Sequence, residues 1–410
     1  MMNALRIGYV AGPIIGALWT FVMAVVACIL VSFATGEGLR PVLIPSLIFG
    51  AWLGFVWLPD GGRTRQERIV WSVGLAILPA LAFLVLSPAI AAAETTSTPT
   101  LVIAWLLFAV TAVWPLEIML RPLPYATATR HEFEDSWIRF LTGFGYIFFT
   151  AIVAIPFYVM VMTSLKNQSE LIQNPLDFSI DLSKGWDLFR SYQELFTDFN
   201  FGNYLWTSFY VSVLTVLLTL AFSIPGAYAV ARLRFKGRTA FSRSILLIYM
   251  VPMIVLALPI YIAFSMTGLR NTIIGIVLIY PVTTIPVALY MLQGYFRGLP
   301  AEVEEAGLMD GLSRLAVIWK ITLPLSLPAL ASVSLYVFMI AWNEFLLAFM
   351  LLDDPSKFTL TRGIASLNSS EIPRQHLMAG AVIATVPIMV LFLGLERFMT
   401  KGLTAGSVKG

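Results

Sequence analysis

The chain has 410 residues, of which 59% are hydrophobic and only 12% are charged. Soluble domains are about 45–50% apolar and about 25% charged, so this composition excludes a soluble globular protein, a disordered chain and a nucleic-acid binder. It predicts an all-α polytopic membrane protein. A formal net charge of +3 is what basic cytoplasmic loops supply. The single cysteine, Cys28, excludes a disulfide within the chain, and two histidines, His131 and His376, leave little for metal binding or catalysis.

Apolar runs long enough to cross a bilayer recur along the chain. A helix that spans the hydrocarbon core needs about 20 mostly apolar residues. By this measure we expect about ten membrane helices, four in the N-terminal third and six after it. The ten predicted spans are Tyr9–Phe33, Pro41–Trp57, Ile69–Ala92, Leu101–Leu120, Phe140–Met162, Leu205–Ala231, Ile245–Met266, Thr272–Leu292, Leu325–Leu352 and Met378–Leu395.

Lysine and arginine in the short loops predict the orientation of these spans. The loops Asp60–Arg68 and Arg232–Arg243 are rich in basic residues, whereas Glu94–Thr100 and Thr267–Thr272 are nearly free of them. Basic loops stay in the cytoplasm. The alternation then places both termini in the cytoplasm, together with loop 294–324. The loops at residues 163–203 and 353–377 face outward.

A polar linker, Arg121–Arg139, separates the first four spans from the last six. We therefore expect two parts, a four-span membrane module at residues 1–130 with an open role and a second domain at residues 131–410. Glycines recur at every fourth position in the first module, at Gly8, Gly12 and Gly16 and again at Gly50 and Gly54. Such rows let helix backbones approach closely, here by packing within the chain or, alternatively, by forming a dimer face.

The cytoplasmic loop Leu299–Leu330 carries a pattern of its own. Pro300 suits the first turn of a helix, and glutamates 302, 304 and 305 lie where the helix dipole favours negative charge. Val303, Ala306 and either Leu308 or Met309 form an apolar stripe, and Gly311 is suited to end the helix in the left-handed conformation. A second helix is expected over Ser313–Ile321, and Pro324 is expected to start the next span. The pattern predicts a short amphipathic helix that fits a groove in a partner.

These residues resemble the "EAA" signature of ABC importer permeases. Glu305-Ala306-Gly307 is followed after three residues by Gly311, after nine more by Ile321, and after one more by Leu323-Pro324. Only Gly307 departs from the signature, which has alanine there. The resemblance implies that loop 294–324 forms a coupling helix in a cleft of a separate ATPase; the alternative is an ordinary amphipathic loop. The implied coupling residues are Glu304, Glu305, Ala306, Gly307, Asp310, Gly311, Ile321, Leu323 and Pro324.

The C-terminal sequence KGLTAGSVKG resembles the tails of carbohydrate-uptake permeases similar to the smaller permease subunit of the maltose importer. Segments Asn203–Tyr210, Pro225–Arg238 and Ala341–Phe349 resemble the same family. The resemblance implies that the tail reaches between two ATPase subunits; the alternative is a frayed end. The implied docking residues are Gly402, Leu403, Thr404, Ala405 and Gly406.

Two polar residues, Asn343 and Glu344, interrupt an apolar span and are candidates for lining the translocation pathway. Alternatively, Glu344 is solvated near the outer interface or bonded to a neighbouring helix. The resemblance also implies that the outer loop Asp353–Met378 contacts a sugar-binding protein.

No phosphate-binding G-x-x-x-x-G-K-[ST] segment is present, so the chain is not expected to hydrolyse ATP or to be an enzyme. No cofactor or metal is expected in this chain, and ATP with Mg²⁺ belongs to the ATPase. The resemblance implies a multi-pass permease of the bacterial inner membrane that imports a sugar, oligosaccharide or polyol. Its implied partners are two ATPase subunits, a second homologous permease, an extracytoplasmic solute-binding protein and membrane lipid. The alternatives are a secondary transporter driven by an ion gradient, which would need mid-membrane carboxylates, and a membrane-embedded enzyme, for which no cluster of His, Asp or Glu is visible.

Overall fold

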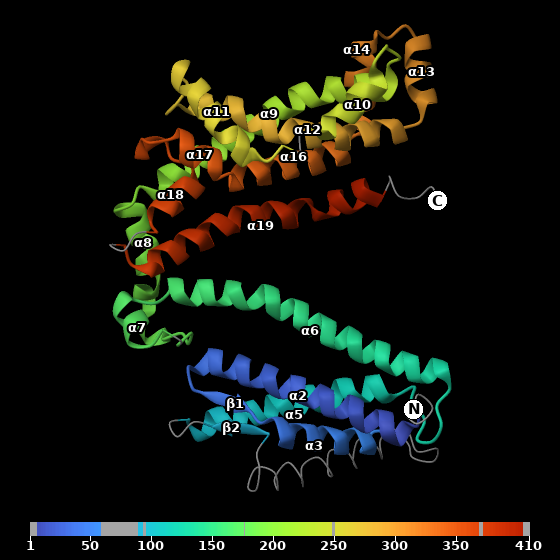
Figure 1. Ribbon diagram of the computed structural model, residues 1–410, viewed down its shortest axis with the longest axis vertical. Helices are drawn as coiled ribbons and strands as arrows, with labels where there is room; N and C mark the ends of the chain where they lie inside the picture. The colour runs from blue at the N-terminus through green and yellow to red at the C-terminus, as the bar shows by residue number, and fades with distance from the viewer. Residues whose placement is uncertain are drawn as a thin grey trace. The chain divides into compact units, whose positions relative to one another are not determined.

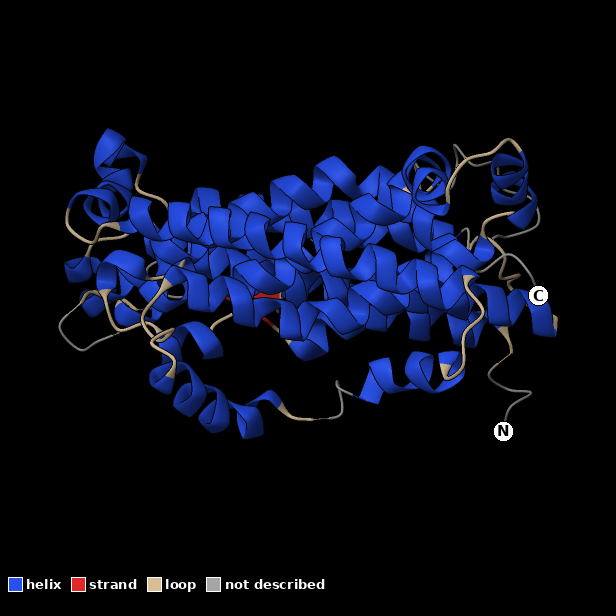
Figure 2. Ribbon diagram, turned by 90° about the horizontal axis from the view of Figure 1, so that it is seen from above, coloured by secondary structure: helices blue, strands red, loops and turns tan. Residues whose placement is uncertain are grey.

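The computed structural model describes residues 6–58, 89–92, 96–175, 177–247, 251–368 and 372–404. The described chain is almost entirely helical (Figure 2) and packs into two compact units, Met1–Leu188 and Phe189–Gly410. Six of its helices are long and apolar enough to cross a membrane, which confirms the all-α polytopic class. The predicted third span, Ile69–Ala92, lies almost wholly outside the described residues.

Unit 1 contains the N-terminal helices and, in addition, the fifth predicted span. The three helices α2, α3 and α5 lie side by side, with α6 along them (Figure 1). Its elements are α2 Gly8–Thr35, β1 Leu39–Pro41, α3 Leu43–Val56, β2 Ile90–Ala92, α5 Thr98–Leu120, α6 Arg130–Ser164, α7 Gln168–Gln173 and, at the unit boundary, η1 Leu182–Phe189.

Strands β1 and β2 pair antiparallel, with Leu39 opposite Ala92. Hydropathy predicted that residues 90–92 end the third membrane helix. The structure shows that they form a strand instead. The amide of Val42 donates to the carbonyl of Ala89 at 2.8 Å, so the pairing satisfies backbone groups that a helix would otherwise satisfy.

The glycine rows bring the backbones of α2 and α3 into direct contact. A Cβ atom on Gly16 would lie 2.1 Å from the carbonyl oxygen of Gly50, and one on Gly54 would lie 2.1 Å from that of Gly12. The rows therefore pack against each other within the chain, which confirms their predicted packing role.

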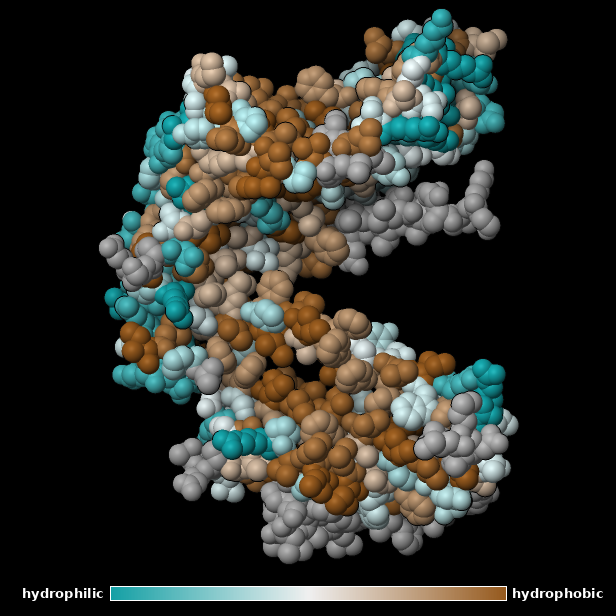
Figure 3. All heavy atoms as spheres, viewed as in Figure 1, coloured by the Kyte–Doolittle hydropathy of each residue, from teal (hydrophilic) through white to brown (hydrophobic). Residues whose placement is uncertain are grey.

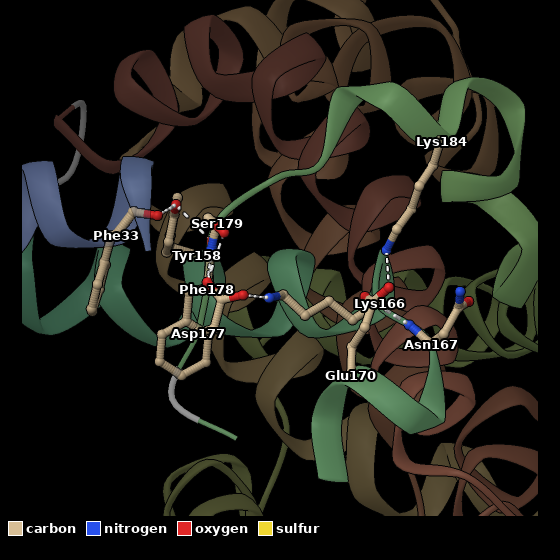
Figure 4. A network of polar contacts seen from close by, with 9 residues as sticks. All are labelled: Phe33, Tyr158, Lys166, Asn167, Glu170, Asp177, Phe178, Ser179 and Lys184. Carbon is tan, nitrogen blue, oxygen red and sulfur yellow. Dashed lines mark hydrogen bonds and ion pairs between the residues drawn. The ribbon is translucent and has the colours of Figure 1, made fainter. Parts of the chain in front are cut away.

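The loop that follows α6 is fastened to the C-terminal end of α2 by the contacts in Figure 4. The hydroxyl of Tyr158 donates to the carbonyls of Phe33 and Phe178 at 2.9 and 3.2 Å, and the rings of Phe33 and Tyr158 stack 5.2 Å apart. Gly36, with φ +74°, leaves no room for a side chain, because a Cβ there would lie 2.7 Å from Oδ1 of Asp177.

Two ion pairs hold this loop in shape (Figure 4). Lys166, which is buried, donates to Asp177 at 2.7 Å, and Lys184 pairs with Glu170. Asp177 also accepts hydrogen bonds from the amide and the hydroxyl of Ser179, at 2.9 and 2.7 Å. The described part of residues 165–188 thus forms a folded segment that packs with the N-terminal helices. We name it the outer segment, because the basic loops predict that it faces outward. The predicted module boundary at residue 130 stays a prediction, since compact packing divides the chain after residue 188.

Unit 2 is built around α9, α12 and α16, with α19 beside α16 (Figure 1). Its buried core centres on Tyr280 and Trp342 towards one end and on Phe296 towards the other. Between α9 and α12, the hydroxyls of Thr219 and Thr284 share a buried hydrogen bond of 2.6 Å. The elements are α8 Arg190–Thr197, α9 Phe201–Arg232, α10 Arg238–Leu247, α11 Met253–Met266, α12 Ile273–Gly298, α13 Ala301–Met309, α14 Arg314–Val317, η3 Ile318–Thr322, α15 Leu323–Leu325, α16 Leu327–Asn343, α17 Leu346–Leu351, η4 Pro355–Lys357, α18 Leu360–Ser366 and α19 Arg374–Thr404.

Two predicted spans of unit 2 are interrupted. The span Ile245–Met266 contains the end of α10 and all of α11, which begins after Pro252; residues 248–250 between them lie outside the described chain. The span Leu325–Leu352 is divided into α16 and α17 at Glu344, whose backbone is extended. Hydropathy alone locates the apolar run, but not the residue at which its helix stops.

Candidate functional site

Helix α13 ends as its sequence predicts, but it begins at Ala301, one residue after the proline that was expected in its first turn. Pro300 precedes the first turn, which contains Glu302 and Glu304. Gly311 has φ +85°; its amide donates to the carbonyl of Leu308 and the amide of Leu312 to that of Gly307, both at 3.1 Å. This pair of bonds is the glycine-dependent Schellman ending of a helix. The chain therefore turns sharply at Gly311.

The second half of the loop is more irregular than predicted. The hydroxyl of Ser313 accepts from the amide of Ala316 at 3.3 Å and caps α14, which continues into the π-helical turn η3. The segment Arg314–Leu325 then meets α16 at an angle of 80°. The sequence predicted that the next long helix starts at Pro324, but it starts at Leu327. Pro324 lies in the short helix α15, and the amide of Ser326 bonds back to Thr322 and Leu323 at the bend.

Glu304 is turned into the protein. Only 6% of it is exposed, and its carboxylate accepts hydrogen bonds from the hydroxyls of Tyr228 at 3.2 Å and Thr322 at 3.1 Å. Oε1 of Glu304 also lies 3.3 Å from Nε of Arg232, the last residue of α9. Arg232 in turn donates to the carbonyl of Leu299 at 2.8 Å. Glu304 thus joins the loop to the end of a membrane helix.

The other face of α13 is open. Glu305, Ala306 and Asp310 are exposed, as is Val303, and 87% of Met309 is exposed. The predicted apolar stripe therefore does not pack inside unit 2. Figure 3 shows hydrophilic residues gathered around α13 and α14, next to apolar residues on the long helices. Helix α13 thus presents a mixed polar and apolar surface that a partner can cover.

Gly307 packs against the second half of the loop. A Cβ atom there would lie 2.5 Å from Cδ1 of Ile321 and 3.6 Å from Cγ2 of Val317. The structure thus brings Gly307 and Ile321 of the signature together. Leu323 is half-buried beyond them, and Pro324 is exposed.

At the other end of unit 2, Glu344 is engaged by the backbone. Its two carboxylate oxygens accept from the amides of Leu347 and Ala348 at 2.9 and 3.1 Å, which caps α17. Asn343 is exposed, and its amide donates to the carbonyl of Met339 at 2.9 Å. The carboxylate of Glu344 thus bonds to the start of α17, and its carbonyl accepts from the hydroxyl of Thr361 in α18 at 2.6 Å. These bonds shape the break between α16 and α17.

The predicted tail lies at the limit of the described chain. Helix α19 extends to Thr404 and so includes the backbone of Gly402, Leu403 and Thr404; Ala405 and Gly406 lie outside the described residues. Among the residues that the structure describes, no three His, Cys, Asp or Glu side chains gather closely enough to hold a metal ion.

Comparison with known proteins identifies the family. Residues 223–404 match the family of binding-protein-dependent transport system inner membrane components. The chain is 38% identical over 269 residues to the inner membrane ABC transporter permease protein YcjP of Escherichia coli. This alignment covers 65% of this chain and 95% of that protein. It is 34% identical over 282 residues to the trehalose/maltose transport system permease protein MalG of Thermococcus litoralis, covering 68% of this chain and 99% of that one.

The fold agrees with this assignment. A bacterial ABC transporter involved in the import of the acidic polysaccharide alginate has a chain that superposes with a TM-score of 0.56 at 22% identity, over 66% of this chain and 98% of that one. This chain therefore belongs to the membrane-spanning permease subunits of binding-protein-dependent ABC importers. It is a transport subunit and not an enzyme, which sets aside the secondary transporter and the membrane-embedded enzyme. About a third of the chain has no counterpart in the two relatives.

Proposed function

We propose that the chain forms half of the translocation pathway for a sugar, oligosaccharide or polyol, and that α13 is the helix through which a separate ATPase drives it. The relatives support the substrate class, because their names include trehalose, maltose and arabinooligosaccharides. The observation that supports the coupling role is that α13 has two different faces. Glu304 is buried and hydrogen-bonded within unit 2, while Glu305 and Ala306 are exposed.

Movement of α13 is transmitted through bonds on its inner face. Glu304 ties it to Tyr228 and Arg232 of α9, and to Thr322 of η3. When the ATPase subunits close on ATP, a pull on the outer face of α13 moves the end of α9 with it. The π-helical turn and the bend before α16 carry the same movement to a second membrane helix. Coupling requires that the ATPase contacts α13 differently in its open and closed states.

The complete transporter in this proposal contains two ATPase subunits, which bind ATP and Mg²⁺, a second homologous permease and an extracytoplasmic solute-binding protein. Both termini and loop 294–324 lie in the cytoplasm, in agreement with the basic loops. Gly402–Gly406 reach between the ATPase subunits. Asn343 is the better pathway candidate of the two, because Glu344 is bonded to the start of α17.

For residues 1–130 we propose a bracing role. Tyr158 and Asp177, which follow the linker, contact Phe33 and Gly36 at the end of α2. Near the other end of α6, Arg139 donates to the carbonyl of Ile118 at 3.1 Å. Helix α6 is thus held near both ends by the N-terminal helices, which keeps the outer segment 165–188 in one conformation.

Docking of α13 is tested by thiol protection in the assembled transporter. Cys28 is replaced by alanine, and a cysteine is introduced at Met309 or, as control, at Leu182, which is 79% exposed in the outer segment. We expect a soluble thiol reagent to label position 309 much more slowly once the ATPase subunits are added, and position 182 at an unchanged rate. Equal labelling of position 309 with and without the ATPase would contradict the docking of α13.

A further inference from the structure

Behind α13 lies a hollow of about 690 Å³ whose lining is strongly basic. It is lined by the last turn of α9, the connection to α10, one side of α13 from Ala301 to Leu308, and the start of α14. Glu305, which is exposed, stands at its edge. Four arginines line it, Arg232, Arg234, Arg238 and Arg314, against two glutamates, Glu304 and Glu305. Since Arg232 is matched by Glu304 at 3.3 Å, three arginines face one remaining carboxylate.

The arginines of the hollow are held in different ways. Arg238 donates to the carbonyls of Val230 and Ala231, at 2.7 and 3.0 Å, which fixes its guanidinium but leaves its charge uncompensated. Arg234 is exposed at the rim. Guanidinium groups bind phosphate oxygens through paired, charge-assisted hydrogen bonds. The volume is within the range of sites for small organic ligands.

The surroundings of the hollow point to the membrane surface. Arg232 is the last residue of α9, one of the helices long enough to cross the bilayer. Apolar side chains flank the arginines: Phe235 lines the hollow and is 45% exposed, and Phe241 and Leu247 are exposed on α10. Exposed aromatic residues beside basic ones are typical of the interface between lipid and water.

We propose that this hollow holds the phosphate of an anionic phospholipid headgroup, with the lipid chains running along the apolar side chains of α10. Basic pockets next to membrane helices on the cytoplasmic side bind such headgroups. A headgroup here also contacts the inner face of α13, so it stiffens the joint between the coupling helix and α9. The choice of the cytoplasmic leaflet rests on the proposed function; the recognition of phosphate rests on the arginines alone.

The test is lipid binding to the assembled transporter, the full-length chain with the second permease and the ATPase subunits, by native mass spectrometry from phosphatidylglycerol or phosphatidylcholine. We expect retained phosphatidylglycerol and no retained phosphatidylcholine. The variant Arg234→Gln should weaken phosphatidylglycerol binding about fivefold. Its matched control, Arg243→Gln, changes an exposed arginine of α10 outside the hollow and should leave binding unchanged.

Four results would overturn the lipid assignment. Equal retention of the two lipids, or equal weakening by the two variants, would show that the hollow does not select the headgroup. Displacement by inorganic phosphate at the affinity of the lipid would identify free phosphate as the ligand. Loss of the lipid when the ATPase joins the isolated permease would mean that an ATPase side chain fills the hollow.

A separate variant distinguishes this proposal from the coupling role. Ala306→Trp enlarges the outer face of α13 without touching the lining of the hollow. If α13 docks as proposed, this variant releases the ATPase but keeps phosphatidylglycerol. If the Ala306→Trp variant keeps the ATPase while Arg234→Gln still weakens lipid binding, the coupling assignment is wrong and the lipid site is supported.

Discussion

Oε1 of Glu304 lies 3.3 Å from Nε of Arg232, and this contact joins the loop of the ABC-permease signature to the last turn of α9. Both side chains are largely buried, with 8% and 14% of their surfaces exposed. The hydroxyls of Tyr228 and Thr322 complete the bonding of the carboxylate. Because the pair is buried, each charge needs the other as its partner. The loop therefore cannot move far from α9 without breaking the pair.

Replacing Glu304 by glutamine should destabilise this joint. The substitution keeps the shape but leaves the charge of Arg232 buried and unmatched, which costs about 3 kcal/mol in comparable sites. We expect a lower midpoint of thermal unfolding for the purified protein. Glu302→Gln, in the same helix but exposed, should leave the midpoint unchanged. Equal midpoints for the two variants would show that the pair contributes nothing to the joint.

Any side chain at Gly311 should destabilise the loop, although nothing crowds the position. A Cβ there has no atom within 4 Å, so any cost of Gly311→Ala comes from φ +85° alone. That conformation costs about 1–2 kcal/mol for a residue with a side chain. Gly298→Ala is the control, because Gly298 is also uncrowded but has no positive φ. Chemical denaturation should separate the two variants, and equal stability would contradict the strain.

Gly307→Ala should be nearly neutral, although it restores the alanine of the family signature. The new methyl group meets Cδ1 of Ile321, which can rotate away at some cost in packing. Alanine also favours the helix by up to about 1 kcal/mol. The double variant Gly307→Ala, Ile321→Val removes the crowding and should be more stable than Gly307→Ala alone in the same denaturation assay. A double variant that is less stable would show that Ile321 is needed for more than space.

Acid should release the outer segment 165–188. Burial alone would raise the pKa of Asp177, but hydrogen bonds from Lys166 and Ser179 outweigh it and hold the pKa below its ordinary value of 3.8. The stabilisation by a carboxyl group with a lowered pKa is complete above that ordinary value and is lost as the pH falls through the lowered one. Pepsin should therefore cleave the segment faster as the pH falls below about 4.

Asp177→Asn supplies the control for this pH effect. The variant lacks this titrating group, so it should be cleaved faster than the unaltered protein at pH 5. Its rate relative to an unstructured peptide should rise less on acidification, because only groups such as Asp181, whose pKa hydrogen bonds from Ser183 lower, still titrate in the segment. The same acceleration in the variant and the unaltered protein would assign the acid response to another group.

Much of the fold could be predicted from local sequence, because membrane helices and their ends depend on neighbouring residues. The span at Tyr9–Phe33 and the turn at Gly311 are examples. The strand at Ile90–Ala92 could not, because its partner lies some fifty residues away. The break at Glu344 does have a local sequence signal, because a carboxylate three residues before Leu347 is placed to cap a new helix.

The sequence also did not predict that Glu304 is buried while Glu305 is exposed. The family resemblance implies both as coupling residues, and only the position of Tyr228 and Arg232 shows which of the two faces inward. Helical spacing gave a partial signal, since Glu304 and Gly307 are three residues apart and share one face. The buried partners themselves come from α9, some seventy residues earlier in the chain.

The central claim, that the outer face of α13 couples the ATPase to the membrane helices, is tested most directly by charge reversal at Glu305. The measurement is ATP hydrolysis by the assembled transporter in proteoliposomes, with and without the loaded solute-binding protein. Glu305→Lys should insert normally but lower the stimulation by the binding protein about tenfold or more. Glu302→Lys, an equal charge reversal in the first turn of the same helix, should retain the stimulation. Full stimulation in the Glu305→Lys complex would contradict the account.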